Sequence, residues 1–295
     1  MSDMLIQAEA LAELLGNPDI VIVDCRFDLL KPAAGRLAWE AGHIPGAYYA
    51  DLDRDLAAPR SAGSGRHPLP DPESFAALLG GWGVTPSTRV IAYDASGGAV
   101  AARLWWLLRW VGHRPVSLLD GGYPDWQAAK LPEEQQSPPL RAGRYPIRPG
   151  AMPVVSTEEV EAGLAAGSLV LLDARDARRF RGEVEPIDVR AGHIPGAINR
   201  PFQANLDALN HFRSPADLEE SFGLLPLSAE QPLASMCGSG VTACHNLFAL
   251  ELAGIAPGII AQPALYVGSW SEWIQSAQRP VATMVANPSQ IARNA

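Results

Sequence analysis

A cysteine stands between an apolar run and an amphipathic segment in the second half of the chain. Residues 232–236 are mainly apolar, Cys237 opens the sequence Cys-Gly-Ser-Gly-Val-Thr-Ala, and a helical pattern then runs through Leu252. This order predicts a strand, a tight loop and a helix. Gly238 and Gly240 permit backbone geometries denied to other residues, so successive N–H groups can form an anion-binding cradle at the positive end of the helix. Such a cradle favours a thiolate, which makes Cys237 a candidate nucleophile.

The loop lacks a residue that cysteine-dependent phosphatases require. Phosphatases with a cysteine in this position need an arginine six residues later to clamp phosphate. Ala243 stands there, and residues 238–249 contain no arginine. A phosphatase is therefore the least favoured enzyme. The alternative of an inert buried cysteine is also disfavoured, because flanking glycines offer no packing advantage.

Composition excludes several classes of protein. The chain has 295 residues, of which 47% are hydrophobic and 19% charged, which is typical of an ordered globular protein. The net charge of −9 argues against a nucleic-acid partner and against a polybasic membrane patch.

Cysteine usage and the N-terminus bear on the compartment. The three cysteines, Cys25, Cys237 and Cys244, form neither a disulfide scaffold nor a paired metal-binding frame. We therefore expect no metal and a reducing compartment. The first residues lack the basic region of a signal peptide, and no apolar run is long enough for a membrane span. These features predict a cytoplasmic protein with no membrane association.

Two halves of the chain repeat one another. The pentapeptide HIPGA occurs at 43–47 and again at 193–197, an offset of 150. An apolar run ending in Asp-x-Arg precedes each copy, with Asp24 and Asp173 separated by 149 residues. A period of this length indicates tandem domains rather than a solenoid.

Short apolar runs alternate with amphipathic stretches in each half, which predicts an α/β fold with mainly parallel sheets. A proline-rich segment, 131–153, separates the halves, and we place the boundary near residue 148, giving domains 1–148 and 149–295. The expected strands are 20–24, 89–93, 116–119, 169–173, 232–236 and 257–260. The expected helices are 5–15, 73–80, 99–111, 156–166 and 241–253.

Taken together, HIPGA, Asp-x-Arg, the segments DGGYPDW and GSWSEW and the loop CGSGVTA resemble the two-domain sulfurtransferases of the rhodanese superfamily. The resemblance covers nearly the whole chain. It implies two tandem rhodanese-like domains and transfer of a sulfane sulfur through a persulfide on Cys237, with a thiol, thioredoxin or cyanide as acceptor and no cofactor. Asp94 stands near the nucleophile position in the first half, so the N-terminal domain is expected to be non-catalytic.

The resemblance also assigns further residues of the site. The uncharged loop is similar to that of the 3-mercaptopyruvate type, with Gly238, Gly240, Val241 and Thr242 around the bound substrate. Ser239 would belong to a proton relay with Cys237 and an acid that maps to Asp53. His67 matches the histidine near the same cleft. For Asp53 and His67 the alternative is a solvated loop.

One departure leaves the sulfur donor open. Arg179 maps to the arginine that grips the donor's carboxylate, a task suited to a planar guanidinium, and its alternative is an ordinary surface arginine. The second arginine expected in a Glu-Pro-Arg segment is replaced by Ile187, and Arg190 is the nearest substitute. Thiosulfate:cyanide sulfurtransfer therefore remains an alternative, as does a persulfide carrier with little turnover of small donors.

Overall fold

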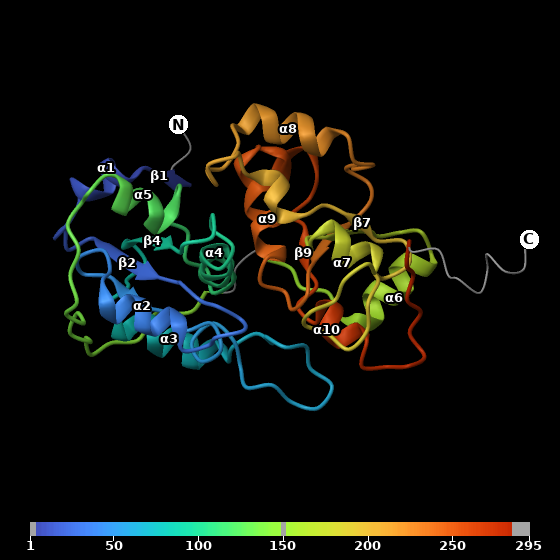
Figure 1. The fold of residues 1–295 in the computed structure, drawn as a ribbon, viewed down its shortest axis with the longest axis horizontal. Coiled ribbons are helices and arrows are strands. Elements are labelled where there is room, and N and C mark those ends of the chain that lie inside the picture. The colour runs from blue at the N-terminus through green and yellow to red at the C-terminus, as the bar shows by residue number, and fades with distance from the viewer. Residues whose placement is uncertain (1–3, 149–151, 285–295) are drawn as a thin grey trace, which may run out of the picture.

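A parallel β-sheet organises each half of the chain (Figure 1). The computed structural model describes residues 4–148 and 152–284. The first sheet has the strand order β1-β5-β4-β2-β3. Its strands are β1 (Leu5–Ile6), β2 (Ile20–Asp24), β3 (Tyr48–Tyr49), β4 (Arg89–Tyr93) and β5 (Val116–Leu119). The helices of this half are α1 (Ala8–Ala12), α2 (Ala34–Ala41), α3 (Pro72–Gly81), α4 (Ala101–Trp110) and α5 (Gly122–Ala128).

The second sheet has the order β7-β6-β8-β9. Its strands are β6 (Val170–Asp173), β7 (Ile198–Asn199), β8 (Leu233–Met236) and β9 (Ala264–Leu265). The helices are α6 (Thr157–Ala165), α7 (Ala177–Arg181), the 3₁₀ turn η1 (Phe202–Asn205), α8 (Pro215–Gly223), α9 (Ala243–Leu252) and α10 (Ser269–Trp273), and a kinked turn, η2, covers Ile255–Ile259. No helix within the described ranges has the length and apolarity needed to cross a bilayer.

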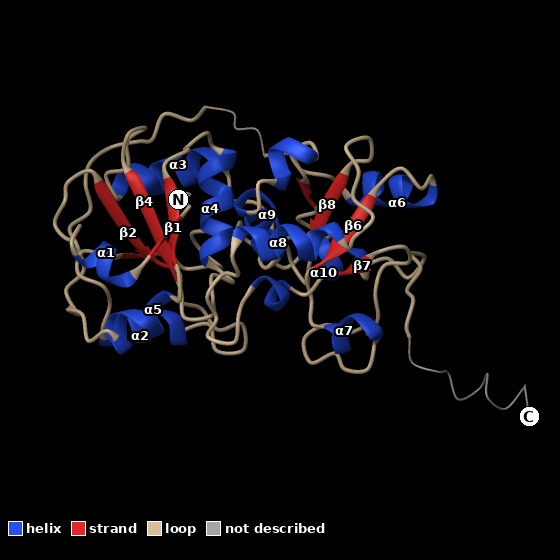
Figure 2. Cartoon of the chain, turned by 90° about the horizontal axis from the view of Figure 1, so that it is seen from above, coloured by secondary structure: helices blue, strands red, loops and turns tan. Residues whose placement is uncertain are grey.

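The second half repeats the topology of the first. Reading β6, β7, β8 and β9 as counterparts of β2, β3, β4 and β5 gives the same strand order, and Val154 makes a parallel bridge to Leu265 where β1 pairs with β5. In the first sheet, alternate residues face opposite layers: Val90 packs with α3 and α4, whereas Ile91 packs with α1 and α5. Figure 2 shows helices on both sides of the strands. The predicted α/β fold of two domains with parallel sheets is confirmed.

Two predicted elements were wrong. The last strand lies at Ala264–Leu265 rather than at 257–260, a segment that forms the kinked turn and contains Pro257. The predicted helix 5–15 begins with the strand Leu5–Ile6 and is helical only over Ala8–Ala12. The apolar residues of this segment fit the period of a helix as well as that of a strand. The start of the segment is a strand because it pairs with β5.

The described residues 131–148 of the proline-rich segment form no helix, in agreement with the predicted extended linker, and they pack against the first half. Glu134 pairs with His43 through an antiparallel bridge, the Tyr48 hydroxyl donates to the Pro139 carbonyl, and Tyr145 is buried. The predicted boundary at residue 148 adjoins residues 149–151, which lie outside the described part.

The repeated motifs form the same buried contacts in both halves. Arg26 pairs with Asp24 and donates to the Gly42 carbonyl at 2.7 Å; the counterpart Arg175 pairs with Asp173 and donates to a carbonyl at 2.8 Å. The histidines of the two HIPGA turns each bond a main-chain carbonyl through Nδ1 and stack on an aromatic ring. Because both copies do this, we infer that these histidines serve the fold.

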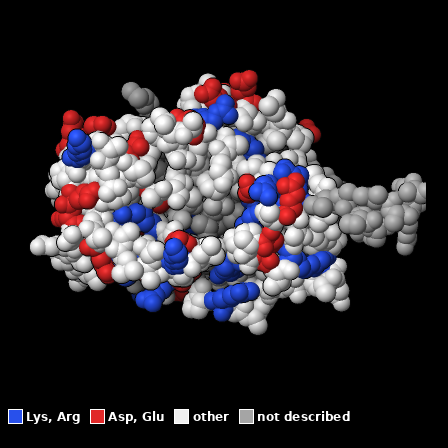
Figure 3. Space-filling model, in the orientation of Figure 1, with Lys and Arg blue, Asp and Glu red and all other residues white. Residues whose placement is uncertain are grey.

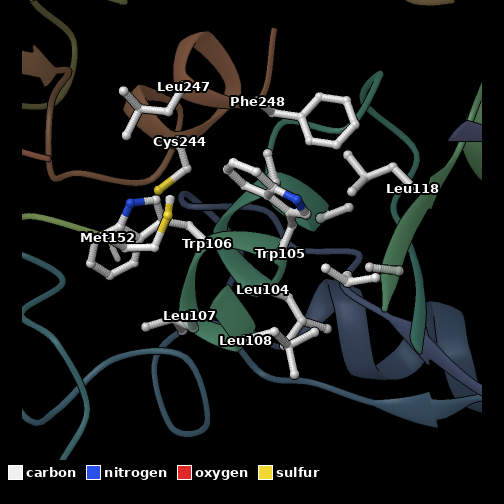
Figure 4. Packing of buried hydrophobic residues seen from close by; sticks show 14 of the residues in the cluster. Leu104, Trp105, Trp106, Leu107, Leu108, Leu118, Met152, Cys244, Leu247 and Phe248 are labelled. Carbon is white, nitrogen blue, oxygen red and sulfur yellow. The ribbon is translucent and has the colours of Figure 1, made fainter. Parts of the chain in front are cut away.

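The two halves meet through α4 and α9, which pack side by side (Figures 1 and 4). The Trp105 and Phe248 rings meet edge to face, 5.2 Å apart, within one apolar cluster. The His245 Nε2 lies 2.9 Å from the Gly97 carbonyl oxygen of the other half. The carboxyl ends of β4 and β8 are therefore held near the interface, where ligand sites commonly form.

Three buried histidines predict acid sensitivity. Burial lowers the pKa of His67 to about 3 and the pKa values of His113 and His245 to about 4. These folded-state pKa values lie below that of an unfolded histidine, so protonation favours the unfolded chain. The folded state therefore keeps its full stability above about pH 6.5 and loses stability as pH falls toward 4. Between pH 7 and 5 we expect the free energy of unfolding to fall by about 2 kcal/mol for each histidine, measured by urea titration. The variant His245→Gln should lessen that fall, and equal stability at both pH values would contradict the prediction.

Candidate active site

The loop after β8 places Cys237 at the N-terminal end of α9. The side chain of Cys237 is 3% exposed, and the Ser239 N–H lies 3.5 Å from its sulfur. The turn depends on Gly240, which has a φ of +78° and comes so close to the Val267 backbone that a Cβ would lie 2.7 Å from its oxygen. The predicted strand, loop and helix are therefore present around Cys237.

The equivalent loop of the first half shows what this backbone holds. Asp94 follows β4 as Cys237 follows β8. Its carboxylate accepts four main-chain N–H groups, those of Ser96, Gly98, Val100 and Ala101, at 2.7–3.0 Å. The loop of this fold is thus an anion cradle, filled in the first half by the chain's own carboxylate.

In the second half, several main-chain N–H groups of the equivalent loop make no hydrogen bond with the described residues. Within the part of the chain that the structure describes, the N–H groups of Gly238, Gly240, Val241 and Thr242 donate to no protein acceptor. Together with the start of α9 they favour negative charge at or beyond the Cys237 sulfur. The same donors suit a thiolate and a bound anionic product.

A buried cation from the first half lies beneath this loop. Arg103 on α4 is fully buried, and its guanidinium donates to the carbonyls of Gly240 at 3.2 Å, Leu56 at 3.3 Å and His67 at 3.3 Å. No carboxylate lies within 4 Å of it among the described residues. Arg103 thus ties the cradle loop to the His67 segment and adds a positive charge below the site.

Ser239, His67 and Asp53 form a hydrogen-bonded chain. The His67 Nδ1 lies 2.7 Å from the Ser239 Oγ, and its Nε2 lies 3.1 Å from the Asp53 Oδ1. Burial, helped by the charges of Arg103 and Arg66, lowers the pKa of His67 to about 3, so the ring is neutral near pH 7. With Nε2–H donating to Asp53, Nδ1 is left to accept the serine hydroxyl.

This geometry refines the predicted relay of Cys237, Ser239 and Asp53. His67 lies between the serine and the aspartate instead of only near the cleft. The arrangement is that of a base oriented by a carboxylate, with the hydroxyl beside the candidate nucleophile.

Arg179 lies in a cluster of opposite charges. Glu185 accepts from its Nε at 3.2 Å and from its Nη2 at 2.7 Å. Asp188 lies 3.2 Å from the same Nη2 and also pairs with Arg66 of the first half at 2.7 Å. Arg175 lies 3.7 Å from Glu185 and completes a group of three arginines and three carboxylates, the third being Asp173.

Most predicted site residues line one cavity of about 360 Å³ between the halves. Those on its wall are Cys237, Gly238, Ser239, Val241, Thr242, His67 and Arg179. Gly240 and Asp53 do not line the cavity: Gly240 forms the turn of the cradle loop, and Asp53 contacts His67, which does line it. Ile187 also lines it, whereas Arg190 donates to the Ser276 carbonyl and does not. The face in Figure 3 shows an uncharged hollow near the middle, with acidic and basic groups interspersed around it.

The sequence interpretation missed Arg66, Arg103 and Asp188. Arg66 stands directly before His67, which was its only signal; the other two gain their meaning from contacts between segments more than 100 residues apart. Cys244 is a core residue: it is fully buried, and burial raises the pKa of its thiol to about 12.

Comparison with known proteins agrees with this architecture. The model of the rhodanese-like domain matches residues 7–129 and again 156–276. A Pseudomonas aeruginosa protein described as "Probable 3-mercaptopyruvate sulfurtransferase" is 48% identical over 96% of this chain and 99% of its own length. A Mycobacterium tuberculosis relative described as "Putative thiosulfate sulfurtransferase SseB" is 38% identical over 94% of this chain and 96% of its own length. The crystal structure of SseA from Escherichia coli, described as a 3-mercaptopyruvate sulfotransferase, superposes with a TM-score of 0.76 at 34% identity and covers 92% of this chain and all of that one.

The chain therefore belongs to the rhodanese family and contains two rhodanese-like domains. The prediction of a two-domain sulfurtransferase, an enzyme nearest to the 3-mercaptopyruvate type, is confirmed by these full-length relatives.

Proposed function

We propose that this sulfurtransferase takes sulfur from 3-mercaptopyruvate, with Cys237 as the nucleophile that carries it. The observation that supports this donor best is the chain from Ser239 through His67 to Asp53, which reaches the loop of Cys237. Sulfur transfer from 3-mercaptopyruvate requires a proton transfer, for which such a relay is suited, whereas transfer from thiosulfate does not.

With 3-mercaptopyruvate, the Cys237 thiolate attacks the substrate sulfur and the carbon–sulfur bond breaks. The electron pair of that bond stays on the pyruvate carbon, and the proton of the substrate thiol must reach that carbon to give pyruvate. The neutral His67, acting through Ser239, accepts and returns this proton. The products are a cysteine persulfide anion and pyruvate, so atoms and charge balance.

With thiosulfate, attack on the outer sulfur breaks the sulfur–sulfur bond and releases sulfite. No proton moves in that step. The cradle of Gly238, Gly240, Val241 and Thr242 would stabilise the persulfide from either donor. Two features keep thiosulfate as a second candidate: Ile187 stands where a second arginine was expected, and one full-length relative is named for that donor.

We assign Arg179 to the donor's carboxylate. Its Nη1 makes no hydrogen bond with the described residues, while Glu185 holds its other edge. Because the surrounding arginines and carboxylates balance in number, the site offers oriented donors with little net positive charge. That suits a monoanion better than the compact dianion thiosulfate.

The charge balance predicts a shift in donor preference. Replacing Asp188 with asparagine removes one negative charge beside Arg179 while keeping the side-chain shape. We expect kcat/KM for thiosulfate to rise about 5- to 20-fold relative to that for 3-mercaptopyruvate, because opposite charges attract at about 4 Å in a partly buried site. Glu183→Gln, at an exposed ion pair with Arg181, is the matched control. An unchanged ratio in Asp188→Asn would contradict the charge argument.

We further propose how the remaining parts act. The persulfide passes its outer sulfur to a thiol, thioredoxin or cyanide, with no cofactor, metal, nucleic acid or membrane involved. Domain 1–148, whose cradle is filled by Asp94, is non-catalytic, and domain 149–295 bears Cys237. The three thiols are free, which suits a reducing compartment such as the cytoplasm.

Donor kinetics test the proposal. Pyruvate and thiocyanate formation with cyanide as acceptor should give a larger kcat/KM for 3-mercaptopyruvate than for thiosulfate. The reverse order would assign the thiosulfate reaction. Persulfide formation only in the presence of a partner protein would instead make the chain a sulfur carrier.

A further inference from the structure

Arg66 belongs to the first domain but is held against the second. The loop between β3 and α3 extends toward α10 (Figure 1). Its Gly65 and Arg66 N–H groups donate to the side chains of Glu272 at 3.1 Å and Ser271 at 2.9 Å. Gly65 lies so close to the second domain that a Cβ would stand 2.6 Å from the Gly268 oxygen. The backbone of Arg66 is therefore fixed across the interface.

The guanidiniums of Arg66 and Arg179 converge on the residue next to the nucleophile. A Cβ on Gly238 would lie 3.2 Å from the Arg66 Nη2 and 3.8 Å from the Arg179 Nη1. Both arginines line the same cavity as Cys237. Asp188 joins them, since its two oxygens lie 2.7 Å from the Arg66 Nη1 and 3.2 Å from the Arg179 Nη2.

Each arginine keeps donors that the protein does not use. Glu185 and Asp188 occupy the Nε and Nη2 of Arg179 and leave its Nη1. The Nη1 of Arg66 is bound to Asp188, its Nη2 has only a long contact of 3.5 Å, and its buried Nε has no hydrogen-bond partner in the described chain. Of the nitrogens of the two side chains, the Arg66 Nη2 and the Arg179 Nη1 lie nearest Gly238.

We propose that Arg66 is the second arginine of the donor site, so that the donor's carboxylate is gripped by one guanidinium from each domain. Arg66 thereby supplies the second guanidinium that is missing because Ile187 stands at the expected arginine position. Arg190 donates to the Ser276 carbonyl and does not contribute. The proposal deepens and rests on the proposed function, because the carboxylate is that of 3-mercaptopyruvate.

Steady-state kinetics separate binding from chemistry. In Arg66→Met we expect KM for 3-mercaptopyruvate to rise about 10- to 100-fold, with kcat within about 3-fold, since a charge-assisted hydrogen bond to the bound donor is lost. Arg66→Lys keeps the charge but loses the planar pair of donors, so its KM should lie between those of the wild type and Arg66→Met. Arg190→Met is the matched control and should retain the wild-type KM. A wild-type KM in Arg66→Met would overturn the proposal.

A second measurement does not depend on sulfur transfer. 3-Bromopyruvate and bromoacetone both alkylate a thiolate with loss of bromide, and only the former has a carboxylate. The rate ratio of the two reagents at Cys237, divided by the ratio for a free thiol, reports carboxylate recognition. We expect this value to fall about 10-fold or more in Arg66→Met and to stay unchanged in Arg190→Met. Changes in thiolate reactivity cancel in the ratio.

The two measurements fail in different ways. If the wild type releases no pyruvate from 3-mercaptopyruvate, the proposed function is wrong, while an Arg66-dependent preference for bromopyruvate still supports the carboxylate site. If pyruvate is released and the alkylation ratio is the same in wild type and Arg66→Met, the role of Arg66 is wrong and the function stands. Circular dichroism and thermal unfolding of each variant confirm that the fold is retained.

Discussion

Replacing Cys237 with serine is expected to lower sulfur transfer by a factor on the order of 10³ or more with either donor. The serine hydroxyl nearly keeps the size of the side chain, but it is a much weaker acid and nucleophile than a thiol, and it forms no persulfide. The backbone donors of the loop remain, so binding of the donor should change little. The loss should therefore appear in kcat, measured as pyruvate release under saturating 3-mercaptopyruvate.

Cys244→Ser supplies the matched control. Cys244 lies in the first turn of α9 and is fully buried. Its sulfur contacts the Gly240 carbonyl at 3.3 Å, a contact that a serine hydroxyl can replace. Its kcat should stay within about 3-fold of the wild type. Turnover in Cys237→Ser at a level similar to that in Cys244→Ser would show that another group carries the sulfur.

Removing the relay is expected to separate the two donors. In His67→Ala and in Ser239→Ala, kcat for 3-mercaptopyruvate should fall about 10²- to 10⁴-fold, the range for loss of a positioned general acid–base. Thiosulfate cleavage moves no proton and should change by less than about 3-fold. Because the pKa of His67 lies at about 3, its titration should also leave no step in the kcat profile between pH 5 and 9.

The double variant tests whether the two residues act as a unit. Ser239 and His67 are linked by a 2.7 Å hydrogen bond, so removing both should cost about as much as removing one. Losses that multiply would indicate separate roles. An equal loss for both donors would show that these residues support the fold of the site rather than proton transfer.

Local features of the sequence were enough to locate the nucleophile and the parallel sheets. The runs before Asp24, Tyr93 and Met236 are buried on both faces and end at glycine-containing or charged loops, so their pattern is strong. The two-residue strands β3, β7 and β9 have no such pattern, because their position depends on pairing with a longer neighbour.

The rest of the site depends on contacts between the domains. Ser239 and His67 are 172 residues apart, and Arg66 and Asp188 are 122 apart. Family resemblance suggested Asp53, His67 and Arg179, but it left Arg66 unnoticed and offered Arg190 as a substitute. Only the packing of α4 on α9 and the anchoring of the Gly65 loop on α10 bring these groups to one cavity.

The most direct test of a Cys237 persulfide formed from 3-mercaptopyruvate is the intact mass of the reduced protein after incubation with that donor, and separately with thiosulfate, beside Cys237→Ser. The account predicts one added sulfur atom in the wild type with 3-mercaptopyruvate, less loading with thiosulfate, and none in the variant. Loading of Cys237→Ser, or no loading of the wild type by 3-mercaptopyruvate, would contradict it.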